Sequence, residues 1–398
     1  MEQKRIYLDN AASTPVAPEV VEAMRPYFTE HYAVASSQFS HTPGIMVKEA
    51  LDRARATLAS KIGADPGEFI FTSGGTEANN LAIKGVAYAH RDKASHIITS
   101  KIEQLSVLQP CRTLEREGFA VTYLDVDREG VVDPGELEAA IRPETILVTI
   151  QTVNQEVGTI QNIKELGRIC RERGVLFHTD AELALGWLTL DVREANIDLA
   201  SFSGHKLHGP KGIGGLYVRE GVKLKKLIEG GYNEFDLRAG TENVPGAVGF
   251  AKAVELFKPE DSQYVRGLRD YLIERLLRIE GSDLNGPRDG ARRHPGNLNI
   301  SFEFAEGESI VLHLDMKGIA VITGSACFSR ALEPSHVLLA MGHTHERAHS
   351  SIRYTLSRYN TREELDRAAE ATREVVEQLR RISPLKRGEE DKDAPALF

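Results

Sequence analysis

The chain has 398 residues, of which 41% are hydrophobic and 27% are charged, values typical of a folded globular protein. Its net charge of −9 argues against sequence-independent binding of nucleic acid, and no apolar run approaches the ~20 residues of a membrane-spanning helix. Three cysteines are too few for a disulfide framework. We therefore expect a cytoplasmic protein with neither nucleic-acid nor membrane partners.

Short apolar runs typical of strands alternate along the chain with longer amphipathic segments typical of helices. The expected strands are 69–72, 96–99, 121–124, 146–150, 175–179 and 199–202. The expected helices between them include 77–89, 105–117, 134–141 and 163–173. This alternation predicts βαβ units and a mostly parallel sheet, which binds ligands at the carboxyl ends of its strands.

The pattern changes after residue 260 to a long helical stretch, an extended run near 297–304 and further helices. We therefore expect a large domain over residues 16–260 and a smaller α+β domain formed by 1–15 together with 261–384. The charged segment 385–398 is expected to be a disordered tail.

A glycine-rich turn at 72–80 (TSGGTEANN) follows an expected strand and opens a helix. The free N–H groups at the start of this helix, with the hydroxyls of Ser73 and Thr76, form a site suited to a phosphate. Taken alone, the same turn could simply cap the helix through Thr76.

A lysine and an aspartate follow two other expected strands. Lys206 comes after the run 197–202, and a lysine buried at a strand end near cationic neighbours has the lowered pKa of a Schiff-base nucleophile. Asp180 follows the run 175–179. A lysine for an aldehyde and a carboxylate for a pyridinium nitrogen are the two groups that pyridoxal phosphate (PLP) requires. Ser203 and His205 could add donors to the phosphate site.

Cys327 follows the small residues 324–326, which suggests an accessible loop suited to a nucleophilic thiol, although an inert loop cysteine is the alternative. Cys111 and Cys170 lie on expected amphipathic helices and are expected in the core. Arg353 offers a bidentate fork for a carboxylate, but it could equally form an ordinary salt bridge.

Five segments together resemble the cysteine desulfurases of the NifS/IscS type, in the class-V aminotransferase family of PLP enzymes. They are 6–15 (IYLDNAASTP), 73–80 (SGGTEANN), 203–206 (SGHK), 238–243 (RAGTEN) and 324–327 (GSAC). The resemblance runs over nearly the whole chain. It implies the α/β fold of PLP-dependent transferases of fold type I, like aspartate aminotransferase, with a mostly parallel seven-stranded sheet in the large domain.

The resemblance also implies the chemistry. Lys206 would form a Schiff base with PLP, Asp180 would hold the ring nitrogen, and Cys327 would take sulfur from L-cysteine as a persulfide, leaving L-alanine. The persulfide would pass to an acceptor or scaffold protein in iron–sulfur cluster assembly or thiolation. Implied cofactor-binding residues are Gly75, Thr76, Gln104, Gln155, Asp180, Leu183, Ser203, His205, Lys206 and Thr241.

Asn10 and Arg353 would bind the substrate, and no metal is implied. Thr241 would reach the phosphate bound by a neighbouring subunit, which implies a homodimer.

The chain departs from the family pattern around the expected ring. Gln104 stands where the family has a stacked histidine, and Gln155 where it has an asparagine. After the aspartate the family has alanine, a small residue and glutamine, whereas this chain has Ala181, Glu182 and Leu183. Gln104 cannot shuttle protons near neutral pH, and Leu183 cannot hydrogen-bond the ring's phenolic oxygen.

These departures keep two alternatives open. One is a related PLP lyase or sulfur-inserting enzyme that acts on another amino acid in specialised metabolism. The other is a non-catalytic assembly scaffold that holds PLP for stability. The presence of Lys206 argues against a scaffold, because a scaffold does not need a lysine that bonds to PLP.

Overall fold

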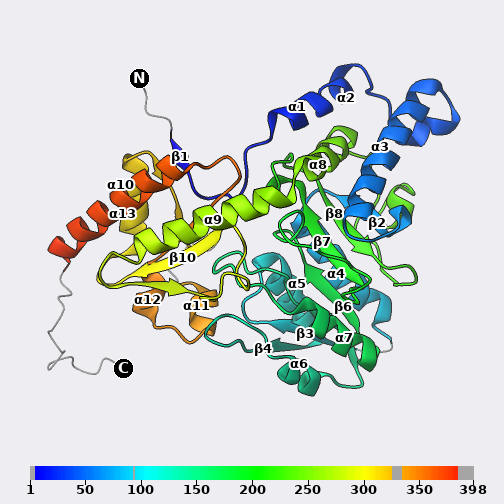
Figure 1. The fold of residues 1–398 in the computed structure, drawn as a ribbon. Helices are drawn as coiled ribbons and strands as arrows, with labels where there is room; N and C mark the ends of the chain where they lie inside the picture. The colour runs from blue at the N-terminus through cyan, green and yellow to red at the C-terminus, as the bar shows by residue number, and fades with distance from the viewer. Residues whose placement is uncertain (1–4, 93–94, 325–333, 384–398) are drawn as a thin grey trace.

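The computed structural model describes residues 5–92, 95–324 and 334–383, so Cys327 and the expected tail at 385–398 lie outside the described residues. Its largest sheet has seven strands in the order β2-β8-β7-β6-β5-β3-β4 (Figure 1). Their bounds are β2 Phe69–Thr72, β3 His96–Ser100, β4 Ala120–Leu124, β5 Thr145–Thr149, β6 Leu176–Asp180, β7 Leu199–Ser203 and β8 Gly214–Val218.

Neighbouring strands of this sheet are parallel except at β8, which runs antiparallel to both β2 and β7. The predicted fold class, a mostly parallel seven-stranded sheet in an α/β protein, is confirmed, and all six predicted strands are present. The sequence pattern did not predict β8, because its first two residues, Gly214 and Gly215, resemble a turn. Gly215 is required by packing instead, since a Cβ there would lie 2.1 Å from the Phe69 ring.

Helices cover both faces of the large sheet. Ile97 and Leu147 belong to one hydrophobic cluster, whereas the next residues along the strands, Ile98 and Val148, belong to another. This alternation is what a sheet buried on two sides requires. The helices of this part are α1 Pro18–Met24, α2 Pro26–Thr29, α3 Thr42–Lys61, α4 Gly75–His90, α5 Leu105–Arg116, α6 Pro134–Ala140, α7 Ile163–Arg173 and α8 Val244–Leu256.

A second sheet, of four antiparallel strands in the order β12-β13-β10-β9, lies in the C-terminal part of the chain. Its strands are β9 Ser282–Asn285, β10 Asn297–Phe302, β12 Ile322–Thr323 and β13 Ser351–Thr355. The accompanying helices are α9 Pro259–Leu276, α10 Gly307–Met316, α11 His336–Ala340, α12 His345–His349 and α13 Arg362–Ile382. The extended run and long helix expected after residue 260 are thus present.

The N-terminal segment joins this second part of the molecule. Strand β1 (Ile6–Tyr7) pairs with β11 (Ile319–Ala320), and the Thr355 N–H donates to the Leu8 carbonyl at 2.7 Å. Figure 1 shows α9 lying along β10 of the second sheet and reaching toward α8, and α9 also contacts α13. The domain boundary at residue 260 stays a prediction.

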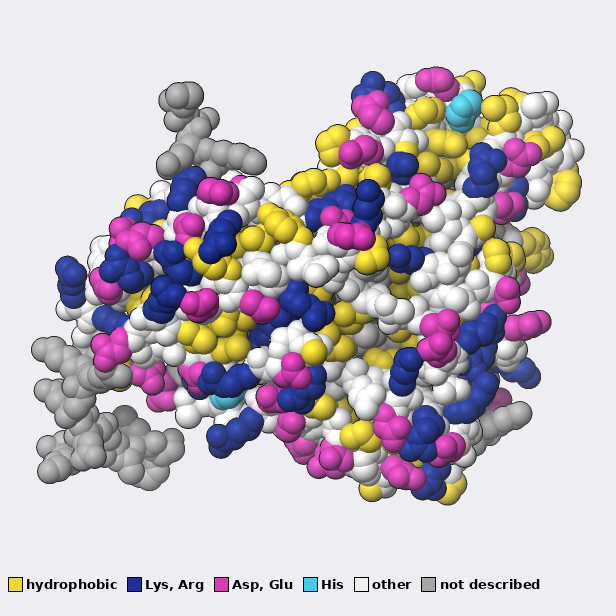
Figure 2. All heavy atoms as spheres, viewed as in Figure 1, with side chains coloured by type: hydrophobic (Ala, Val, Ile, Leu, Met, Phe, Trp, Pro, Cys, Tyr) yellow, Lys and Arg dark blue, Asp and Glu magenta, His cyan; other side chains and the backbone are white. Residues whose placement is uncertain are grey.

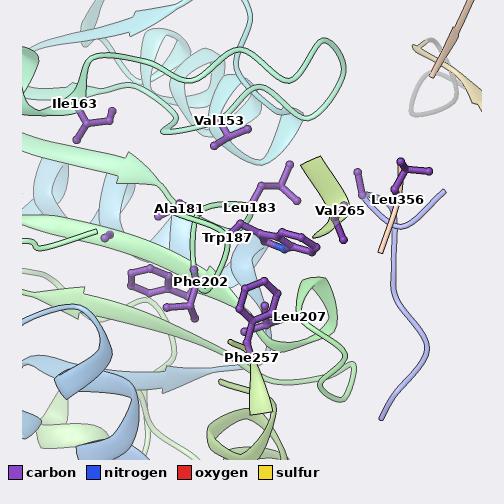
Figure 3. Packing of buried hydrophobic residues seen from close by; sticks show 14 of the residues in the cluster. Val153, Ile163, Ala181, Leu183, Trp187, Phe202, Leu207, Phe257, Val265 and Leu356 are labelled. Carbon is purple, nitrogen blue, oxygen red and sulfur yellow. The ribbon is translucent and has the colours of Figure 1, made fainter. Parts of the chain in front are cut away.

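One continuous apolar cluster connects the carboxyl edge of the large sheet to the C-terminal part. In Figure 3, Leu183 lies beside Trp187, whose ring meets Phe257 edge-on with centroids 4.8 Å apart, and Val265 and Leu356 extend the cluster. This packing fixes the loop after β6, from which site residues project. Within the described ranges, no helix combines the length and apolar character needed to cross a membrane.

Candidate active site

Lys206 lies just beyond the carboxyl end of β7, on the short 3₁₀ helix η3 (Gly204–Lys206). Its side chain is buried, and Nζ donates to the carbonyls of Ala11 at 2.6 Å and Ala12 at 3.1 Å. Burial lowers the pKa of Lys206, and the charge of Glu182 opposes this effect. The amine is therefore easier to deprotonate than that of a surface lysine, as nucleophilic attack on an aldehyde requires.

Asp180 ends the neighbouring strand β6 and is also buried. Its Oδ2 accepts a hydrogen bond from the Asn79 amide at 2.8 Å, and Oδ1 accepts one from the Glu182 N–H at 3.1 Å. Burial raises the pKa of Asp180, while these two hydrogen bonds and the charge of Lys206 lower it. The lysine and the carboxylate expected to serve PLP thus lie near each other at one sheet edge.

The sequence did not single out Asn79 as a site residue. It lies on α4 one turn after Thr76, within the motif that was expected to hold a phosphate. Its amide nitrogen also donates to Ser106 Oγ at 3.0 Å, at the start of α5. Ser106 thus helps to hold the Asn79 amide, which in turn orients the Asp180 carboxylate. Helical spacing offered a signal, because residues three apart share a face.

The expected phosphate site is the N-terminus of α4, which begins at Gly75. Strand β7 reaches this point, because Ser203 pairs with Gly214, and a Cβ on Gly214 would lie 2.6 Å from the backbone of Gly74. Gly75 is buried, whereas Thr76 is exposed.

Two polar atoms near this turn are buried and have no hydrogen-bond partner among the described residues, namely Ser203 Oγ and His205 Nδ1. Leaving such atoms unpaired costs roughly 1–3 kcal/mol each. Burial lowers the pKa of His205 to about 4, so its neutral ring can donate to an anion. The amine, carboxylate and unpaired donors present therefore fit the aldehyde, ring nitrogen and phosphate of PLP.

Arg353 lies on β13 and faces the same region. Its guanidinium donates to Asp9 Oδ1 at 2.7 Å and to the Gln155 carbonyl at 3.4 Å, while Nε is buried without a partner among the described residues. The arginine thus forms an ion pair and keeps one unused donor. Asn10 also lies here, but its amide donates to the Thr355 carbonyl at 2.8 Å.

Thr241 is exposed on the loop before α8, apart from the buried groups. Arg238 of the same loop forms an ion pair with Glu77 on the first turn of α4, with Nε 2.9 Å from Oε1. The loop that carries Thr241 is therefore attached to the expected phosphate site while Thr241 itself points outward.

The residues that depart from the family pattern differ in their surroundings. Gln104 is the N-terminal cap residue of α5 and is half-buried, as is Gln155. Leu183 is buried and packs in the apolar cluster with Trp187 (Figure 3). Packing thus takes the place of polar contacts at Leu183. The roles of all three toward a cofactor stay predictions.

Sequence reasoning also missed two buried acids near the site. Glu103 accepts hydrogen bonds from Ser100 Oγ at 2.6 Å and from the Gln151 N–H, yet burial raises its pKa to about 8. Burial raises the pKa of Glu156 to about 7, although the Ser335 hydroxyl and the charge of Arg353 lower it. Glu103 stands next to Gln104 and Glu156 next to Gln155, so the sequence offered no pattern that marked either acid as buried.

Glu156 lies between the two described ends of the segment that contains Cys327. Its Oε1 lies 1.9 Å from the position that a Cβ on Gly324 would take, and Ser335 hydrogen-bonds to its side chain. Cys111 and Cys170, by contrast, are buried on α5 and α7, and burial raises the pKa of each thiol to about 12. Neither is suited to act as a nucleophile near neutral pH.

Comparison with known proteins places this site in a family. A model of the class-V aminotransferases matches residues 6–368. The chain belongs to the class-V aminotransferase family. It is 52% identical over 387 residues to the cysteine desulfurase IscS of Methanosarcina thermophila, covering 96% of this chain and 95% of that protein. Recognition of the cysteine desulfurase group from the sequence motifs is thus confirmed.

Solved structures of related class-V aminotransferases share the fold. A NifS-like protein, 36% identical, superposes with a TM-score of 0.88 over 94% of this chain and all of that chain. A structure described as SspA in complex with cysteine, 38% identical, has a TM-score of 0.80 and covers 89% of this chain and 100% of that chain. Enzymes of this family depend on PLP.

Proposed function

We propose that this protein is a PLP-dependent cysteine desulfurase that converts L-cysteine to L-alanine and carries the released sulfur on Cys327. The observation that carries the proposal is the buried Lys206 amine next to the buried Asp180 carboxyl group, at adjacent strand ends. The identity of 52% to a cysteine desulfurase, and the cysteine complex of a 38% identical protein, support the substrate.

PLP, when bound, would withdraw electrons from the α-carbon of an amino acid. Asp180 would hold the ring nitrogen, and Lys206 would bond to the aldehyde carbon. Gly75, Thr76, Ser203 and His205 would hold the phosphate, through the helix N–H groups and the two unpaired side-chain atoms.

The chain's own residues would position cysteine and move its protons. Lys206 Nζ, oriented by the carbonyls of Ala11 and Ala12, can hold a proton and deliver it to carbon. Arg353 would bind the substrate carboxylate through its unpaired Nε, while Asp9 keeps the guanidinium oriented.

The sulfur transfer would consist of one exchange of bonds. The Cys327 thiolate attacks the substrate sulfur, an S–S bond forms, and the Cβ–S bond breaks. The electron pair of the broken Cβ–S bond remains on the three-carbon product, which takes up a proton and leaves as alanine. Cysteine and a thiol thus give alanine and a persulfide, and no external oxidant or reductant is needed. An acceptor protein in a reducing cytoplasm would then receive the sulfur.

A homodimer forms part of the proposal. Figure 2 shows hydrophobic side chains gathered over α1, α2 and the start of α3. Phe39 and Tyr232 are 91% and 87% exposed, and Phe28, Tyr32 and Phe235 are also exposed. Such apolar patches mark protein–protein interfaces. Sedimentation equilibrium should give a dimer, and an active monomer loaded with PLP would contradict this part of the proposal.

A second candidate function, action on another amino acid, is favoured by Gln104 and Leu183, because the first cannot shuttle protons and the second cannot hydrogen-bond at the expected ring. A panel of amino acids, assayed for sulfide, alanine and keto acid, separates the two. Alanine and sulfide formed in equal amounts from cysteine support the desulfurase. Faster turnover of another amino acid, without persulfide on the protein, would overturn it.

A further inference from the structure

A buried carboxyl group that the proposed mechanism does not use lies beside the first turn of α4. Glu182 follows the end of β6 by two residues and is 6% exposed. Its Oε1 lies 1.8 Å from the position that a Cβ on Gly75 would take, so only glycine leaves room for it there. The Glu182 carboxyl group thus lies at the same turn where the phosphate of PLP is expected.

This turn is suited to one anion. The first N–H groups of a helix have no intrahelical acceptor, and the helix dipole adds positive potential at the N-terminus. Ser203 Oγ and His205 Nδ1 are buried and unpaired beside it. When a phosphate occupies the turn, a second anion in contact with it is repelled, and an ionisable neighbour responds by taking up a proton.

The nearest charges favour the same response. Burial raises the pKa of Glu182 to about 8, the charge of Asp180 raises it as well, and Lys206 lowers it. One lysine therefore faces two carboxyl groups before any phosphate adds its negative charge.

The other groups at this turn do not compensate for that excess. Burial lowers the pKa of His205 to about 4, so its ring is neutral near pH 7. Glu77, on the first turn of α4, is already paired with Arg238. The charges of Lys211 and Arg353 act on His205 and Lys206, and among the described residues Lys206 is the cation whose charge lowers the pKa of Glu182.

We propose that Glu182 is a cofactor-binding residue that carries a proton when PLP is bound and donates an O–H···O hydrogen bond to the phosphate. This inference rests on the proposed function, because it requires PLP at the site. Loading then takes up a proton from solvent wherever Glu182 is ionised in the cofactor-free protein. Below about pH 8 the group is already protonated and affinity is unaffected, whereas above it affinity falls about tenfold per pH unit.

The experiment titrates the full-length protein, stripped of cofactor, with PLP between pH 7 and 10, following the cofactor's visible absorbance. Native protein is compared with Glu182→Gln, which keeps the shape and a hydrogen-bond donor, and with Glu182→Ala. Glu68→Gln is the matched control, since Glu68 is a buried acid at the opposite edge of the sheet, just before β2. At each pH, the Kd of native protein is divided by the Kd of each variant. This ratio removes the effect on binding of the protonation of Lys206 and of PLP itself.

We expect the Kd of native protein, relative to Glu182→Gln, to rise about fivefold between pH 8 and 9 and about tenfold between pH 9 and 10, with Glu68→Gln following native protein. Calorimetry of native protein at pH 9 in two buffers of different ionisation enthalpy should show about one more proton taken up than in the Glu182→Gln variant. Parallel pH profiles, or variants that fold but bind PLP no better at pH 9, would overturn the inference. Failure of native protein to bind PLP at any pH would instead overturn the proposed function.

Discussion

Replacing Asn79 with alanine removes a hydrogen bond that orients the Asp180 carboxylate, while Asp180 and Lys206 themselves stay unchanged. The amide donates to Asp180 Oδ2 at 2.8 Å inside the protein, where both residues are buried. A hydrogen bond to a charged group contributes about 1.5–3 kcal/mol, so its loss should raise the pKa of Asp180 by about one to two units.

This shift works against the reaction, because Asp180 must be ionised to hold a protonated ring nitrogen. We expect Asn79→Ala to lower kcat/KM for alanine formation by about 10- to 150-fold. The acid limb of the pH–rate profile should move to higher pH, since the raised pKa leaves Asp180 protonated over a wider acid range. A merely structural defect would lower the rate without moving that limb.

Asn80→Ala is the matched control. Its amide donates to the Thr76 carbonyl at 2.9 Å on the exposed side of the same helix, so it removes a similar bond without reaching Asp180. Initial rates of alanine and sulfide formation, measured between pH 5 and 9 on both variants, test the reasoning. Equal rates and equal pH profiles for the two variants would show that Asn79 does not act through Asp180.

Three further predictions concern the cofactor, the altered site and the fold. Lys206→Ala should abolish turnover and the visible absorbance of bound cofactor, and product formed at the native rate would refute the role of Lys206. Gln104→His should raise the rate of cysteine desulfuration, most clearly together with Leu183→Gln, because a general acid–base group contributes ~10²–10⁴-fold to a reaction rate. An unchanged or lower rate would contradict this expectation. Glu234→Gln should reduce the free energy of unfolding by about 3–5 kcal/mol, because Arg55, whose Nη1 lies 2.6 Å from Oε2 of Glu234, would become a buried unpaired charge. Chemical denaturation measures this loss, and a change below 1 kcal/mol would contradict it.

The sequence predicted the parallel strands well, because each is a short apolar run between helical patterns. It failed at β8, where Gly214 and Gly215 are fixed by the approach of Gly74 and of the Phe69 ring rather than by a local turn. Local patterns cannot show contacts between segments that lie far apart in the chain.

Some residues of the candidate site could also be predicted from the sequence, and others could not. Lys206 and Asp180 were predictable because strand ends of a parallel sheet meet at one edge. Glu182 and Glu156 were not, since their significance depends on the space left by Gly75 and Gly324 in distant segments. Leu183 was expected beside a cofactor only through the family resemblance, and its packing against the apolar cluster became visible only in three dimensions.

The most direct test of the proposed function is the location of the sulfur after a single turnover. Protein loaded with PLP is mixed with L-cysteine without reductant, digested, and examined by mass spectrometry while alanine is quantified. We expect one extra sulfur atom on the peptide that contains Cys327, one alanine per persulfide, and neither product in Lys206→Ala. Alanine without sulfur on Cys327, or sulfur on Cys111 or Cys170 instead, would contradict the proposal.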